Sequence, residues 1–255
     1  MGEPDEDASG GAFGGGVPGG SAEEILRLHE RYLEEVVEGL GLCPFARRCR
    51  EQDRIRRPLF DLRELPAGEP SAVHCAREVA TITRDVPEVE VILLTFVVPE
   101  GHSWQEPSGP GGFEDFVREL RAAYEALADG PRYYMVSFHP GLGRALLDRK
   151  LTQDSLVPLI RRTPDPVIQC IRAELLDSFR QQAQVVAEER FRAEIAKLDP
   201  ELRILLEHAI QADPELSSEI ARNNFKTIGE GEGREDFERR LAEIRVARQR
   251  LRGRK

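Results

Sequence analysis

Apolar and polar residues alternate at helical spacing in the first stretch that could form an ordered element. From Ser21 to Leu40, apolar residues recur every three or four positions, which is the period of an amphipathic helix. Ser21 followed by Glu24 has the sequence of a capping box, so we expect the helix to begin at this serine. Gly39 and Gly41 are typical of its C-terminal end.

The next part of the chain alternates between strand-like and helix-like patterns. Three segments have the composition of strands: 54–62, 89–98 and 132–140. Pro58 favours an edge position for the first, and the second is apolar on both faces, as a covered central strand would be. Helical patterns over 71–84 and from 113 to about 130 lie between them. The order predicts an α/β fold with a small three-stranded sheet, βαβαβ-like, flanked by helices.

Beyond residue 150 the pattern is helical. Three Asp-Pro pairs, at 165–166, 199–200 and 213–214, each precede apolar residues at helical spacing and predict helix starts. A last helix is expected over 234–251, with an apolar seam interrupted by Arg248. We therefore divide the chain into a disordered glycine-rich tail (1–20), an α/β core domain (21–180) and a helical extension (181–255).

Composition narrows the classes of partner. The net charge is −10 and the pI about 5.2, and the core segments lack the basic stripe of a nucleic-acid-binding protein. The basic final stretch IRVARQRLRGRK could contact an anionic surface, but we interpret it as a solvated helix end. The longest apolar run, 91–98, is too short to span a bilayer, and the N-terminus does not resemble a secretory signal. Four cysteines in 255 residues do not suggest a disulfide scaffold. We expect a cytoplasmic protein that binds neither nucleic acid nor membrane.

The stretch GLGLCPFARRCRE (39–51) holds the first candidate for chemistry. If Pro44 is the first residue of a helical turn, Cys43 is its N-cap, and the helix dipole would favour the thiolate. Arg47 and Arg48 add positive charge within one turn, and Arg47 is also a candidate substrate contact. The alternative is a small apolar residue packed in a corner between Leu42 and Phe45.

The stretch SFHPGLG (137–143) holds the second candidate. His139 follows a predicted strand, where ligand crevices of open α/β sheets lie, so it could act as a base or as the partner of a thiol. Ser137 is a candidate substrate contact. The alternative is a histidine that hydrogen-bonds a loop carbonyl.

Two arginines, Arg161 and Arg162, precede the helix expected after Pro166. Guanidinium groups near free N–H groups could bind an anion, and we select Arg162 as the candidate contact. The alternative is a solvated pair that balances an acidic chain. Neither zinc spacing nor a cofactor fingerprint is evident, so we predict no metal site and no cofactor.

Three stretches resemble an uncharacterised bacterial family, the domain of unknown function 1415: GLGLCPFA (39–46), VSFHP (136–140) and RRTPDPVIQCIRAE (161–174). A weaker likeness covers 219–229, and 181–218 looks inserted. Gln169 and Cys170 stand where the family pattern leads us to expect a histidine nearby. The resemblance implies a cytosolic bacterial protein with no assigned reaction, in which Cys43, His139 and Arg162 belong to one shared feature.

Two functional hypotheses follow. The first is a thiol-dependent enzyme or sensor for a small anionic substrate, with Cys43 as nucleophile, His139 as base and Arg162 as anion contact. The second is a non-catalytic interaction module, whose C-terminal helices bind a protein partner or a second copy of the chain.

Overall fold

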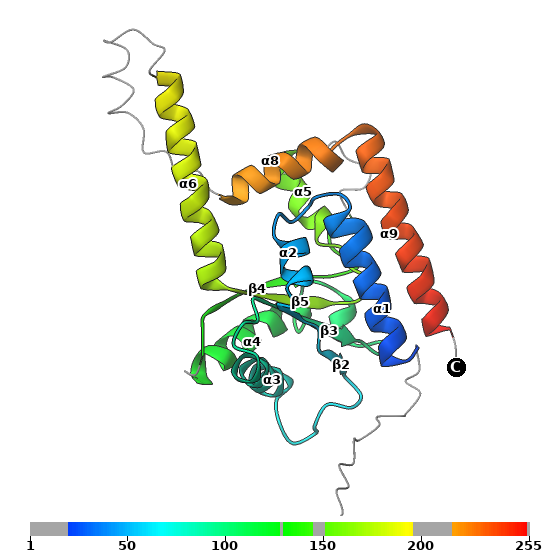
Figure 1. The fold of residues 1–255 in the computed structure, drawn as a ribbon. Helices are drawn as coiled ribbons and strands as arrows, with labels where there is room; N and C mark the ends of the chain where they lie inside the picture. Colours follow the sequence, from blue (N-terminus) through cyan, green and yellow to red (C-terminus); the bar gives the residue numbers. More distant parts are fainter. Residues whose placement is uncertain (1–19, 128–129, 145–150, 196–215, 254–255) are drawn as a thin grey trace, which may run out of the picture.

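The protein has a mixed α/β fold built on a five-stranded sheet (Figure 1). The computed structural model describes residues 20–127, 130–144, 151–195 and 216–253. The strands are β1 (Ile55–Arg56), β2 (Leu59–Asp61), β3 (Val91–Val97), β4 (Tyr133–Phe138) and β5 (Val167–Arg172). The order is β1-β3-β5-β4, and β2 continues the line of β1 along β3. The sequence predicts a three-stranded sheet, so the predicted number of strands is too small.

Helices cover both faces of this sheet. They are α1 (Ala22–Tyr32), a π-helical turn η1 (Leu33–Glu38), α2 (Ala46–Glu51), α3 (Ser71–Asp85), a 3₁₀ turn η2 (Ser103–Gln105), α4 (Phe113–Leu127), α5 (Gln153–Ile160), α6 (Ala173–Ile195), α8 (Leu216–Ile228) and α9 (Gly231–Arg252). Helices α3 and α4 lie on one side of the sheet, whereas α1, α2, α5, α8 and α9 lie on the other (Figure 1). Among the described residues, no helix is both long and apolar enough to cross a bilayer.

Several expectations from the spacing are confirmed. Ser21 caps α1 with the reciprocal bonds of a capping box, in which its hydroxyl accepts from the Glu24 N–H at 3.2 Å. Pro58 stands on the edge line formed by β1 and β2, which pair with β3 alone. Of the predicted disordered tail, residues 1–19 lie outside the described residues, as do the helix starts at 199–200 and 213–214.

The strand β5 was wrongly predicted as a helix. Its residues pair antiparallel with β3 and with β4, so it separates two strands that run parallel to each other. The sequence VIQCIR is apolar at both helical and strand spacing, and such a short run does not distinguish the two. Tertiary contacts decide that this segment is a strand. It hydrogen-bonds to a neighbouring strand on each edge, and its apolar side chains are covered on both faces of the sheet, as in a central strand.

The register of the three longest strands sorts their side chains between two faces. On one face, Ile92 and Leu94 of β3 lie opposite Cys170 and Ile168 of β5, and they pack with the aromatic residues of α4 and η2. On the other face, Leu93 lies opposite Gln169, which in turn lies opposite Val136 of β4. The two faces of the sheet therefore carry different side chains: an apolar and aromatic cluster on one, and a polar residue, Gln169, among apolar ones on the other.

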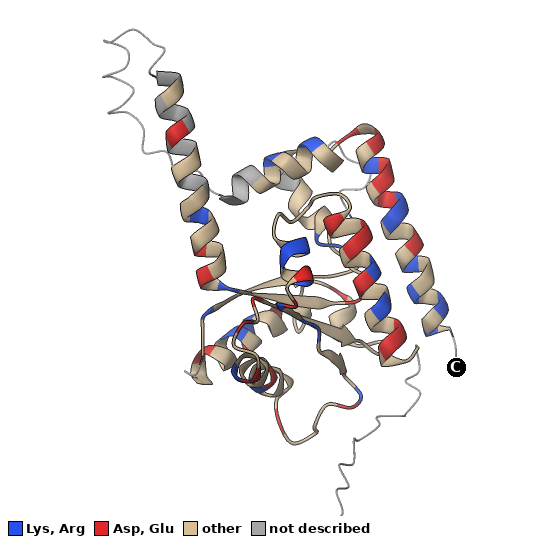
Figure 2. Ribbon diagram, in the orientation of Figure 1, with Lys and Arg blue, Asp and Glu red and all other residues tan. Residues whose placement is uncertain are grey.

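The C-terminal helices pack against the N-terminal one. Phe237, Leu241 and Ile244 of α9 share a hydrophobic cluster with Leu28 and Tyr32 of α1. Charged residues are frequent along both helices, whereas the strands carry few (Figure 2). The apolar seam of α9 predicted from the sequence therefore packs against α1 of the same chain.

A buried carboxylate holds these helices to the sheet. Asp165 is 0% exposed, and Arg248 of α9 donates from Nε to its Oδ2 at 2.6 Å. Arg252 donates to Oδ1 at 2.8 Å, and Nε2 of His29 on α1 lies 3.1 Å from Oδ2. Arg248 interrupts the apolar seam because it binds this carboxylate. The predicted role of Asp165 as a helix cap is wrong.

We predict that Asp165→Asn lowers the free energy of unfolding by about 3–5 kcal/mol, because two arginines would lose the charge that compensates them. Urea denaturation followed by circular dichroism measures this. Asp53→Asn is the matched control, since the Asp53 side chain is 89% exposed and its ion pair with Arg56 contributes little. Equal stability of the two variants would contradict the role assigned to Asp165.

The same carboxylate gives an expected pH dependence. Burial alone would raise the pKa of Asp165, but the hydrogen bond from His29 and the charge of Arg248 outweigh it and hold the pKa far below its usual range. The unfolded chain has the ordinary value of about 3.9, so this stabilisation is complete above that pH and is lost as the pH falls below it. Wild-type stability should drop more steeply below about pH 4 than that of Asp165→Asn.

Candidate functional site

A cavity of about 330 Å³ lies on the face of the sheet opposite α3 and α4. Its floor is Leu93, Thr95, Val136, Phe138, Val167, Gln169 and Ile171 from the central strands. Its walls come from α1, η1, the 42–46 segment and α5, and α8 provides Ile220, Ala221 and Asn224. Most of this lining is apolar, so its few polar groups have few protein partners nearby and are candidates for ligand contacts.

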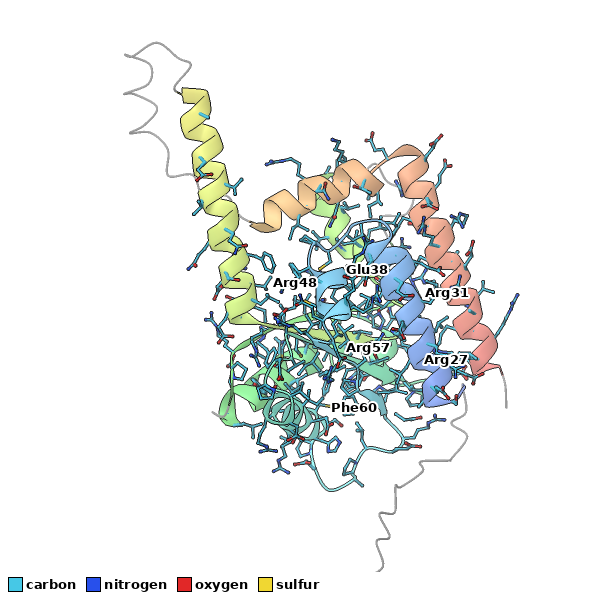
Figure 3. The ribbon with its side chains drawn as sticks, viewed as in Figure 1. Arg27, Arg31, Glu38, Arg48, Arg57 and Phe60 are labelled. Carbon is cyan, nitrogen blue, oxygen red and sulfur yellow. The ribbon has the colours of Figure 1, made fainter. Side chains whose placement is uncertain are left out.

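Arg57 lines the cavity from the edge of the sheet, between β1 and β2, and lies beneath α1 (Figure 3). One of its amino groups, Nη2, donates to Glu30 of α1 at 3.1 Å. The other, Nη1, is buried and has no hydrogen-bond partner among the described residues. A buried guanidinium donor without an acceptor is costly, which points to an acceptor that the protein itself does not supply.

Arg161 lines the cavity from the loop between α5 and β5. Burial lowers the pKa of its guanidinium, and the charge of Glu114 opposes this only in part. No hydrogen bond or ion pair of its side chain occurs among the described residues. The arginine thus brings to an apolar cavity a positive charge without a bonded partner in the described chain.

Two more buried polar groups of the lining lack partners. Tyr32 is 6% exposed, and its hydroxyl has no hydrogen bond within the described part of the chain. Asn224 is 1% exposed, and its Nδ2 donates to the Leu42 carbonyl at 3.3 Å, while its Oδ1 has no partner in the residues that the structure describes. Burial raises the pKa of the tyrosine, which therefore stays protonated at neutral pH.

Cys43 forms part of the cavity wall beside Phe45. The N-cap of α2 is Phe45, not Cys43 as the sequence suggested, because the chain turns for two residues before the helix begins. Burial raises the pKa of the Cys43 thiol to about 11, and hydrogen bonds from the Phe45 and Ala46 N–H groups offset this only in part. At neutral pH the residue is a neutral thiol.

His139 lies on the other side of the sheet. Its ring packs against Phe113 of α4, with 5.8 Å between centroids. The Gly141 N–H donates to Nδ1 at 2.9 Å, so the proton is on Nε2, which donates to the Trp104 carbonyl at 2.9 Å. Burial lowers the pKa of this imidazole. The structure brings no thiol to the histidine, and both ring nitrogens are already used.

The other predicted contacts do not reach the cavity. Arg162 is 1% exposed, pairs with Glu238, and lies over the Phe237 ring at 5.5 Å. Arg47 is on the surface, with Nε 3.6 Å from Glu38. Ser137 alternates with the cavity residues Val136 and Phe138 along β4, so it faces α4.

The described part of the chain contains no group of three or more His, Cys, Asp or Glu side chains that could hold a metal ion. The thiols are divided by the sheet, since Cys75 of α3 packs in one cluster with Cys170 of β5, whereas Cys43 and Cys49 lie on the cavity side. All four cysteines are free.

Sequence comparison assigns the chain to a family. The family described as "Protein of unknown function (DUF1415)" matches residues 24–199, and the chain belongs to it. The match covers α1 to α6 but not α8 and α9, which complete the cavity and the core cluster. Neither a curated protein nor a solved structure matches the chain.

Local sequence patterns do not identify most of the residues that line the cavity. Arg161 stands next to Arg162, and no local pattern shows which arginine of the pair faces a cavity. Tyr32 and Asn224 occupy positions of helical patterns that look like core or surface. Alternation along a strand could have identified Gln169, the one polar residue in VIQCI, had that segment been recognised as a strand.

We predict that Cys43 reacts with iodoacetamide at pH 8 roughly one to two orders of magnitude more slowly than a free thiol with the ordinary pKa of about 8.5. The reason is its raised pKa and partial burial. Mass spectrometry of the peptide carrying Cys43 gives the rate, and the urea-unfolded protein is the control. A native rate as fast as the unfolded one would contradict this assignment.

Proposed function

We propose that the protein binds a small anionic molecule with an apolar body in this cavity, as a ligand-binding protein or sensor. The observation that carries the proposal is Arg161, a half-buried guanidinium without a carboxylate partner in the described chain, set in an apolar lining. The unpaired Nη1 of Arg57 adds a second donor that lacks an acceptor. A bound anion would give an acceptor to a guanidinium of this lining, and a charge-assisted bond to arginine is among the stronger ones.

The surroundings also favour an anion. The charges of Arg162 and Arg245 act on the Tyr32 hydroxyl, which lines the same cavity. Burial lowers the pKa of Arg245, and the like charges of Arg162 and Arg144 add to that effect. Glu238, which pairs with Arg162, opposes part of this effect, and an anion at the cavity would lower the repulsion that remains between these cations.

Thiol catalysis receives less support than binding. A nucleophilic cysteine needs thiolate at neutral pH and a base within hydrogen-bond reach. Cys43 has a raised pKa, and His139 belongs to the opposite face of the sheet. We therefore propose no covalent step and assign Cys43 to the wall of the binding cavity.

Arg161→Met should weaken binding of octanoate by about 10- to 100-fold, because the charge-assisted hydrogen bond is lost while the length of the side chain is kept. Binding of 1-octanol should be unchanged. Isothermal titration calorimetry measures both, and Arg47→Met is the matched control at an arginine outside the cavity.

The variant should fold, because no hydrogen bond or ion pair of the Arg161 side chain occurs in the described chain. Circular dichroism checks this. If wild-type protein does not bind octanoate or its hexanoate and decanoate homologues, or if Arg161→Met binds them as well as Arg47→Met does, the proposed function is wrong.

A second candidate function is self-association through α6, whose second half lies in the predicted helical extension. Unlike α9, which packs against α1, this part of α6 exposes apolar side chains. Val185 and Val186 are adjacent on this helix and 54% and 44% exposed. Exposed apolar neighbours are typical of contact surfaces. The double substitution of both valines by glutamate should convert a dimer to a monomer in light scattering, and a wild-type monomer at the same concentration would exclude this candidate.

The cytoplasm remains the proposed location. Four free thiols, none paired with another, are compatible with a reducing compartment.

A further inference from the structure

We infer that the ligand carries a hydrogen-bond donor on its apolar body in addition to its anionic group, and that Asn224 and Gln169 select for that donor. The inference rests on the proposed function, because it concerns the same cavity. It assigns the ligand to the class of hydroxy or amide-containing organic acids, as distinct from plain hydrocarbon acids.

Asn224 provides the first observation. Its side chain is almost fully buried where α8 lines the cavity, and its Nδ2 donates to the Leu42 carbonyl. That bond fixes the orientation of the amide, because only the NH₂ group can donate to a carbonyl. Oδ1 is thereby left as a buried acceptor to which none of the described residues donates. Only a group with an N–H or O–H can satisfy it.

Gln169 provides the second observation. It occupies the centre of the floor, between Leu93 of β3 and Val136 of β4 in the register of the sheet. No hydrogen bond of its amide occurs among the described residues, and the neighbouring floor residues are apolar on both sides. An amide placed there can both donate to a ligand and accept from it.

The energetics favour a polar ligand body. Oδ1 of Asn224 is already shielded from water, and a hydrocarbon chain that filled the cavity would leave it without a donor and would exclude water from Gln169 as well. A buried polar group without a partner costs about 1–3 kcal/mol. A ligand with a hydroxyl or amide N–H in reach avoids this cost, so its affinity gains relative to the hydrocarbon analogue.

The two polar requirements come from different elements. Asn224 belongs to α8, whereas Arg57 and Arg161 belong to the sheet edge and to the loop that leads into β5. The anionic group would contact the arginines and the donor would contact the asparagine. A ligand with its two polar groups separated by an apolar spacer fits this arrangement.

The experiment compares matched acids that differ by one hydroxyl. Hexanoate, octanoate and decanoate and their ω-hydroxy counterparts are titrated into the full-length protein by isothermal titration calorimetry. We expect at least one ω-hydroxy acid to bind about tenfold more tightly than its parent, the change expected from one satisfied buried group. The series of lengths allows for the unknown span.

Variants assign the preference to the residues. Asn224→Leu should abolish the preference for the hydroxy acid, and Gln169→Leu should reduce it, while Arg161→Met should weaken both acids of a pair equally. Asn223→Leu is the matched control, since Asn223 is exposed on the same helix. Because Asn224→Leu also removes the bond to Leu42, thermal unfolding is measured for each variant. Gln169→Leu loses no hydrogen bond and keeps the test decisive if Asn224→Leu does not fold.

The outcomes separate the inference from the proposed function. If each acid and its hydroxy counterpart bind equally in wild-type protein, ordered water satisfies the amides, and the inference is overturned while anion binding stands. A preference that persists in both Asn224→Leu and Gln169→Leu also overturns it. If no acid of either series binds, the proposed function itself fails.

Discussion

The buried carboxylate of Asp165 is the contact on which the arrangement of the second layer depends. It lies in the segment that enters β5 and receives hydrogen bonds from Arg248 and Arg252 of α9, with His29 of α1 at the same oxygen as Arg248. Such a cluster is stable only if every charge is compensated, so it fixes the direction of α9 relative to the sheet. Apolar packing between α1 and α9 adds stability but is less directional.

With these helices fixed, the two faces of the sheet differ in how closely they are packed. Under α3 and α4, aromatic rings such as Phe96, Phe113 and Trp104 fill the space through edge and tilted contacts. On the other face, helices α1, α5 and α8 surround a cavity whose polar groups are only partly bonded. Retaining unsatisfied polar atoms lowers stability, and proteins commonly accept that where a ligand completes the bonding.

Neighbouring residues in one motif can have unrelated roles, as the arginine pair illustrates. Arg162 is enclosed by Glu238 and the Phe237 ring, so its charge serves packing, whereas Arg161 turns to the cavity and has no such partner. Cys43 and His139 show the converse, because two residues that look like a catalytic pair lie on opposite faces of the sheet: Cys43 in the 42–46 segment of the cavity wall, and His139 after β4, packed against Phe113 of α4. Site residues must therefore be chosen by face and not by chemistry alone.

The sequence by itself determined the local elements whose signals lie within a few residues. The capping box at Ser21, the helices over 71–84 and from 113 to about 130, the edge position of Pro58 and the family of the chain were all predicted from neighbouring residues. The tertiary structure alone decided that VIQCIR is a central strand and that Asp165 is an ion-pair centre and not a cap. It also decided which polar groups face the cavity. These outcomes depend on pairing and burial between segments far apart in the chain, and such long-range contacts leave no periodic trace in the sequence of either segment.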